Sequence, residues 1–363
     1  MFEKLDNFLA PRNLAALTGI ALIYCLAGKL GLRVAFVHPY VTPIWVSSGI
    51  AITAFILFGY RVWPAILLGG FFDHLTTDGF VIASFTIPVI ATLEGLAGAY
   101  LVNKYAHGAK TFDTARDVFC FVFFACICAP LISATLGASM EHLRGVSVPD
   151  LAPRWLAWWL AYGVGTLLVS PFLILLLRAS HHRLNLREFG ELALLLVGLI
   201  FVCLLVFGPL SLSLNKSGAL RAFLCVPFLL WAAFRFCQLE AAGATLIVFG
   251  AAIWGTLHGY GSFVAKDLAT SLVALDTFIG VIGTMTLVVA AMVAERRRIE
   301  SELLGTQSLL QEVLKRKERD LVVTVQALDV EAASHAQTNR AFQENQGRSR
   351  RLGERTKPEE KRQ

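Results

Sequence analysis

The 363-residue chain is 56% hydrophobic and only 16% charged, which is too apolar for a water-soluble globular protein with an ordinary charged surface. Its formal net charge of +6 does not indicate a nucleic-acid partner, because the basic residues stand in short clusters at the ends of apolar segments. Period-two alternation of apolar and polar residues is absent, so helices are the expected spanning elements and a β-barrel is excluded.

Apolar segments recur from residue 14 to residue 294, and most are long enough to cross a hydrocarbon core about 30 Å thick. We predict an all-α polytopic membrane protein, embedded in the lipid bilayer, with about ten transmembrane helices in a bundle. The third segment is the weakest because its apolar run is short and ends in Asp73-His74. If it enters the membrane without crossing it, the number of spans becomes odd. The predicted spans are residues 14–28, 44–58, 62–75, 80–102, 118–138, 155–177, 192–208, 219–236, 241–257 and 268–294.

The distribution of lysine and arginine predicts the orientation of the chain. Ten spans that start from a cytoplasmic N-terminus at residues 1–13 place more basic residues inside than outside. Arg296, Arg297 and Arg298 directly follow the last span, so the C-terminus is also expected in the cytoplasm.

Ionisable side chains within or beside the spans are costly in lipid and are therefore candidate ligand-binding or signal-binding residues. Glu94 lies in mid-segment among small residues, with an interhelical hydrogen bond as the structural alternative. Asp73 and His74 lie near the outer end of the third span, where solvation at the interface is the alternative. His38 stands in the first outer loop, where it either helps to bind a polar ligand or belongs to a turn.

Arg235 and Asp276 are the remaining ionisable candidates, with a paired structural role as the alternative. The chain has no phosphate-binding loop, HExxH motif, GxSxG elbow or Gly-rich ATP lid. His335 precedes Asn339 by four residues, as in phospho-accepting helices, but Ala336 replaces the usual acid. We therefore expect no enzymatic activity, no catalytic residues, no metal site and no cofactor.

Beyond Ala294 the composition changes from apolar to charged, which marks the end of the membrane domain at residues 14–294. Residues 295–345 are predicted to form a cytoplasmic signalling helix that pairs as a parallel homodimeric coiled coil. Gln307, Lys317 and Thr324 occupy core positions of the same register, so a single solvated helix remains the alternative. Residues 346–363 lack apolar periodicity and are predicted to be disordered. The predicted coil interface consists of Leu303, Leu310, Leu314, Leu321 and Leu328.

Four motifs in order resemble the membrane-associated sensor domain of the first class, the MASE family, type one. They are GLRVAFVHPYVTPIWVSSGIAITAFILFGYRVWPAILLGG, TLEGLAGAYLV, PLISATLGA and WLAWWLAYGVGTLLVSPFLILL. The resemblance covers roughly residues 31–295 and implies a multi-span sensory domain of the bacterial inner membrane. Such domains usually precede histidine kinase, PAS, diguanylate cyclase or phosphodiesterase modules and pass their signal through the last helix.

The resemblance also implies which positions bind the signal, although two departures place the ligand specificity in doubt. Val46 and Ser47 stand where the family usually has prolines, and Tyr162 stands where it often has an acid. The carried-over positions are His38, Pro39, Thr42, Pro43, Trp45, Ser48, Gly49, Glu94, Trp158 and Trp159.

The favoured function is a dimeric membrane sensor that signals to a separate cytoplasmic partner, such as a kinase or cyclase, since no output domain follows the coil. The alternatives are a transporter or channel subunit with Glu94 and Asp73 in its substrate path, and a remnant that has lost its output domain.

Overall fold

The computed structural model describes residues 11–35, 44–78, 82–179, 185–209, 221–266 and 268–355. Its contacts divide the chain into two units, Met1–Arg296 and Arg297–Gln363. Within the described ranges the secondary structure is entirely helical, without a strand. Seven helical segments in these ranges are long and apolar enough to cross a membrane.

Each of the ten predicted segments coincides with one helix or with consecutive helices, but the count of ten spans is not confirmed. The 13-residue helix α3 and the 16-residue helix α4 rise only about 20 and 24 Å, less than the thickness of a hydrocarbon core. The apolar helix Phe223–Arg235 is similarly short. In chain order the elements are α2 (Pro11–Ala35), α3 (Val46–Phe58), η1 (Tyr60–Val62), α4 (Trp63–Asp78), α5 (Ala83–Tyr105), η2 (Gly108–Lys110), α6 (Ala115–Phe121), η3 (Val122–Cys128), α7 (Pro130–Leu143), α8 (Val148–Arg178), α9 (Leu186–Phe207), η5 (Phe223–Cys225), α11 (Val226–Arg235), α12 (Gln238–Leu257) and α13 (Leu268–Arg355).

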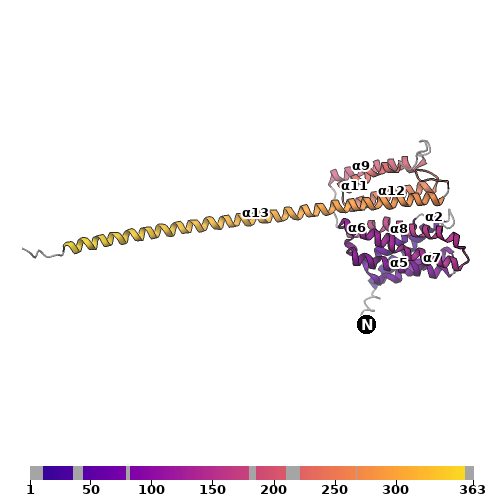
Figure 1. Ribbon diagram of the computed structural model, residues 1–363, viewed down its shortest axis with the longest axis horizontal. Helices are drawn as coiled ribbons and strands as arrows, with labels where there is room; N and C mark the ends of the chain where they lie inside the picture. Colours follow the sequence, from indigo (N-terminus) through magenta and orange to yellow (C-terminus); the bar gives the residue numbers. More distant parts are fainter. Residues whose placement is uncertain are drawn as a thin grey trace, which may run out of the picture. The chain divides into compact units, whose positions relative to one another are not determined.

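Two large hydrophobic clusters and a small one form the core of the first unit, and α13 contributes to both large ones. One cluster joins α8, α9, α11 and α12 to residues of α13 that include Leu275 and Ile279. The other contains residues of α2 through α6, of η3, α8 and α12, and Leu287 and Ala291 of α13. Within this unit α13 runs between the group of α9, α11 and α12 and the group of α5 to α8 (Figure 1). Its membrane segment is therefore packed on both sides.

The predicted fifth span contains a π-helical segment, η3, between α6 and α7. The amide of Ala129 donates to the carbonyl of Phe124, five residues earlier, at 2.9 Å. Pro130 follows directly and has no amide hydrogen to donate, so the carbonyl of Cys126 loses its usual helical partner. That carbonyl lies against Gly163 of α8, where a Cβ atom would collide with it. The missing side chain thus allows the widened turn to approach α8 closely.

Beyond Arg296 the described part of α13 is exposed at every residue whose accessibility is known, including its leucines. Disorder was predicted from Gln346, whereas the structure continues the helix to Arg355. Gln346–Arg355 contains four arginines, a glutamine and a glutamate and no proline, and these helix-forming residues oppose the cost of Gly347 and Gly353 in a helix that has already formed. Residues 356–363 lie outside the described part.

Candidate functional site

Glycines bring α2 and α4 close together and place Tyr24 beside Asp73. A Cβ atom at Gly28 of α2 would collide with the Asp73 carboxylate, so this acid lies directly against the helix backbone. A Cβ atom at Gly70 of α4 would lie 3.3 Å from the Tyr24 ring. Asp73 is 1% exposed and Tyr24 is 2% exposed. The alternative in which Asp73 is solvated at the interface is therefore wrong, because glycine contacts enclose the carboxylate between helices.

A stack of three aromatic rings borders this acid. The Trp45 indole lies between the His74 ring, with centroids 6.4 Å apart and planes at 22°, and the Tyr162 ring, at 5.8 Å and 14°. His74 belongs to α4, Trp45 precedes α3 and Tyr162 belongs to α8. Trp45 and His74 are 7% and 6% exposed, so neither lies in a lipid-facing aromatic belt or in interfacial water. The stack links three helices at one place.

Glu94 of α5 is the second buried acid, at 1% exposure. The hydroxyl of Ser133 in α7 donates a hydrogen bond to its Oε2 atom. Its Oε1 atom is buried and has no hydrogen-bond partner among the described residues. The interhelical hydrogen bond that was the structural alternative is thus present, but it satisfies only one of the two oxygens. A buried carboxyl oxygen without a partner is costly, which makes Glu94 a candidate ligand-binding residue.

The two acids share their surroundings. Both Glu94 and Asp73 interact electrostatically with the hydroxyls of Tyr24 and Tyr162. The polar groups that converge here are two carboxyls, two phenols and an imidazole, enclosed by apolar helices. We call Tyr24, Trp45, Asp73, His74, Glu94 and Tyr162 the acid–aromatic site. Such a set offers donors and acceptors for a small polar ligand, whereas no described group of three or more His, Cys, Asp or Glu residues could hold a metal ion.

The comparison with known families agrees with this architecture. The family model described as MASE1 matches residues 16–297, which is most of the chain and contains the acid–aromatic site. The chain belongs to the MASE1 family. It is accordingly a multi-pass membrane protein with a MASE1 sensory domain, as the four sequence motifs predicted. Neither the search of curated proteins nor that of solved structures gave a match.

One position of the site departs from what the resemblance to the MASE family implies. That resemblance implies an acid where this chain has Tyr162, whose ring is part of the stack. The tyrosine supplies a phenol hydroxyl and an aromatic face in place of a negative charge.

Ser48 lies next to the site but joins helices. Its hydroxyl oxygen is 2.8 Å from the Trp45 carbonyl, 2.9 Å from the Tyr162 carbonyl and 3.1 Å from the Thr166 hydroxyl. A Cβ atom at Gly165 would collide with the Trp45 carbonyl, so α3 and α8 touch through their backbones here. This polar contact holds Trp45 and Tyr162, and therefore the stack, in place.

The remaining predicted residues do not join this site. Trp158 packs against Gly137 of α7, and the indole of Trp159 donates to the Ile127 carbonyl at 2.9 Å. Arg235 forms an exposed ion pair with Glu191 at 2.7 Å, so it does not provide the proposed structural pair with Asp276. His38 and its neighbours at positions 39, 42 and 43 lie outside the described residues.

Sequence reasoning did not identify Tyr24, Ser133 or Tyr162 as site residues. Tyr24 and Ser133 are uncharged and lie in apolar segments, where nothing distinguishes them from ordinary packing residues. The signal that could have found Tyr162 was a tyrosine at a position where the resemblance implies an acid. A polar residue within a span deserves attention at the position where its family often has a charge.

Proposed function

We propose that this protein is a sensor of the bacterial inner membrane. The acid–aromatic site binds a small ligand or a membrane partner, which changes the packing of the helices around it. Helix α13 relays the change to a cytoplasmic signalling partner, such as a kinase or cyclase, and both termini lie in the cytoplasm. Membership of the MASE1 family supports the sensory role.

The packing of α13 carries this proposal. Its membrane segment contributes to both hydrophobic clusters, so a shift of one cluster against the other would move it. The same helix continues past the end of the family match, at residue 297, as far as Arg355. A ligand can shift such a packing equilibrium only through its different affinity for the two states. An element that contacts both clusters is suited to report that difference.

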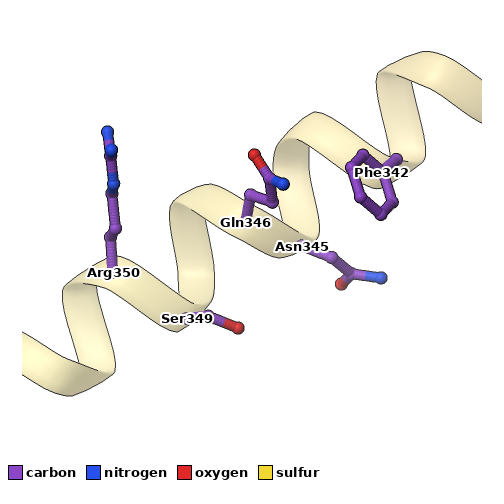
Figure 2. A pocket seen from close by; sticks show the side chains of 5 residues that line it. All are labelled: Phe342, Asn345, Gln346, Ser349 and Arg350. Atoms are coloured by element: carbon purple, nitrogen blue, oxygen red, sulfur yellow. The ribbon is translucent and has the colours of Figure 1, made fainter.

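The exposed face after Arg296 supports pairing of two copies through a coiled coil. The predicted interface leucines, from Leu303 to Leu328, are each about 60% exposed in the single chain, a costly arrangement in water. Figure 2 shows Phe342, Asn345 and Ser349 on one side of the helix, and their spacing continues the a and d positions of the same register. We infer a parallel homodimer in which this seam is covered by the second copy.

The transporter alternative is supported by one observation, the burial of the Glu94 and Asp73 carboxyls in an apolar unit. Acids at such positions occur in the substrate and proton paths of transporters. Uptake of solute by proteoliposomes that is lost in Glu94→Gln would favour this function. A relay through α13 does not require uptake, so the two functions give different results.

Photo-crosslinking in native membranes tests the sensor proposal. A photoreactive phenylalanine analogue at Leu314, on the seam, should capture a second copy and a cytoplasmic signalling protein. The same analogue at Leu309, which lies off the seam on the same helix and is equally exposed, is the matched control. Glu94→Gln should change the yield of the crosslink to the signalling protein. Equal crosslinking from both positions, or capture of no signalling protein from either, would contradict the proposal.

A further inference from the structure

A cavity lies within the first unit, and none of the acid–aromatic site residues lines it. It has a volume of about 430 Å³ and is bordered by η3, α8 and α13. Its lining is apolar apart from Asp276 and Thr284 of α13 and the thiol of Cys126. A volume in this range suits a small molecule, because ligand pockets in proteins occupy roughly 300–1,000 Å³.

Asp276 is the only charged residue among those that line the cavity. It is 5% exposed, and its Oδ1 atom is buried without a hydrogen-bond partner among the described residues. An acid in this position is expensive to bury alone, and a protein ordinarily provides a partner. Here no lysine, arginine or histidine lines the cavity, so a cationic occupant would supply the partner that the lining lacks.

The other walls favour a cationic group with an apolar body. Trp159 lines the cavity, and its N–H already donates to the Ile127 carbonyl of the π-helical segment. The indole therefore offers an apolar and π-electron surface and no free donor. An aromatic ring attracts a nearby cation and also packs well against hydrocarbon. Met285, with its flexible side chain, lines the same cavity and adapts to ligands of different shape.

We propose that this cavity binds a small amphipathic amine, whose ammonium group pairs with Asp276 and whose apolar body lies along α8 and η3. The ligand would contact α13 directly, because Asp276, Gly280 and Thr284 lie one turn apart on that helix and all line the cavity. The binding event does not depend on the sensor function, so it can be measured on its own.

The test uses the full chain in lipid nanodiscs and three probes with one body and different end groups. They are 3-phenylpropylamine, 3-phenylpropanol and 3-phenylpropionate, and empty nanodiscs correct for partition into lipid. The amine should bind more tightly than the alcohol and the acid. Asp276→Asn should weaken amine binding at least about tenfold and leave alcohol binding unchanged, because only the charged pair is lost.

Two further variants test whether the amine occupies this cavity. Gly280→Leu should abolish amine binding without loss of the fold, since a Cβ atom at this position meets nothing within 4 Å and the added side chain enters the cavity. Asp117→Asn is the matched control, as it removes another buried acid, which pairs with His107 outside both sites, and it should bind the amine like the parent protein. Equal amine affinity in Asp276→Asn and the parent, or weakening in Asp117→Asn alone, would overturn the proposal.

Discussion

The membrane unit and the helix beyond Arg296 place polar and apolar side chains in opposite ways. In the membrane unit Asp73, Glu94 and Asp276 are buried, while large apolar residues such as Leu26 and Phe201 are each 65% exposed. Beyond Arg296 charged and apolar residues are exposed alike. Exposed apolar side chains in the first region are satisfied by lipid. In the second region charged residues accompany them, and the proposed coiled coil would cover the leucines with a second copy.

The largest expected effect tests whether close backbone contact builds the membrane unit. Gly165→Leu should destabilise the unit by at least about 3 kcal/mol, because the new side chain collides with the Trp45 carbonyl and separates α3 from α8. Thermal unfolding in nanodiscs and the yield of monodisperse protein measure this loss. Gly250→Leu on α12 is the control, since nothing lies within 4 Å of its Cβ position. Similar stability of both variants would refute the role assigned to Gly165.

The next effect concerns the exposed helix. Leu314→Asp should weaken dimerisation by at least about tenfold, because a buried leucine contributes about 1.5–3 kcal/mol and a charge cannot replace it in the seam. Single-molecule photobleaching in vesicles at fixed protein density gives the fraction of dimers. Leu309→Asp, off the seam, should dimerise normally. If the two variants behave alike, the leucine seam is not the contact between copies.

A smaller effect is expected inside the acid–aromatic site. Ser133→Ala removes the hydroxyl that donates to Glu94 and should cost about 0.5–2 kcal/mol of stability. Ser139→Ala on the same helix removes an exposed hydroxyl that bonds only to the Thr135 carbonyl in the described contacts, and should cost less. Thermal unfolding of both variants in one nanodisc preparation measures the difference. Equal losses would mean that the Ser133 hydroxyl adds nothing to the packing of α5 against α7.

The smallest effect is expected at Arg235. Arg235 and Glu191 form an ion pair, and their side chains are 46% and 38% exposed. Arg235→Gln should therefore change stability by less than about 1 kcal/mol. Arg235→Gln and Glu191→Gln should behave alike in thermal unfolding. A strong loss of signalling in Arg235→Gln alone would restore this arginine as a candidate for binding the signal.

The elements were largely predictable from the sequence, whereas the site was predictable only in part. Long apolar runs predict helices because lipid leaves the backbone no other partner, and each of the ten runs coincides with helix. Glu94 and Asp73 were recognisable because a charge in lipid is costly. Their neighbours Tyr24 and Tyr162 were not, because they join the site only through the way helix faces meet. Glycine contacts such as that between Gly28 and Asp73 decide this packing, and no periodicity in one chain specifies them.

Because of the π-helical turn before Pro130, a regular helical-wheel projection does not describe this region. A turn with one additional residue rotates every side chain that follows about the helix axis. Helix α7 therefore presents a different side to its neighbours than a uniform helix beginning at Ala115 would. Ser133 reaches Glu94 from that altered position. Deleting one residue from the turn would therefore restore the regular pitch and direct Ser133 elsewhere, although each side chain of α7 would keep its chemical identity.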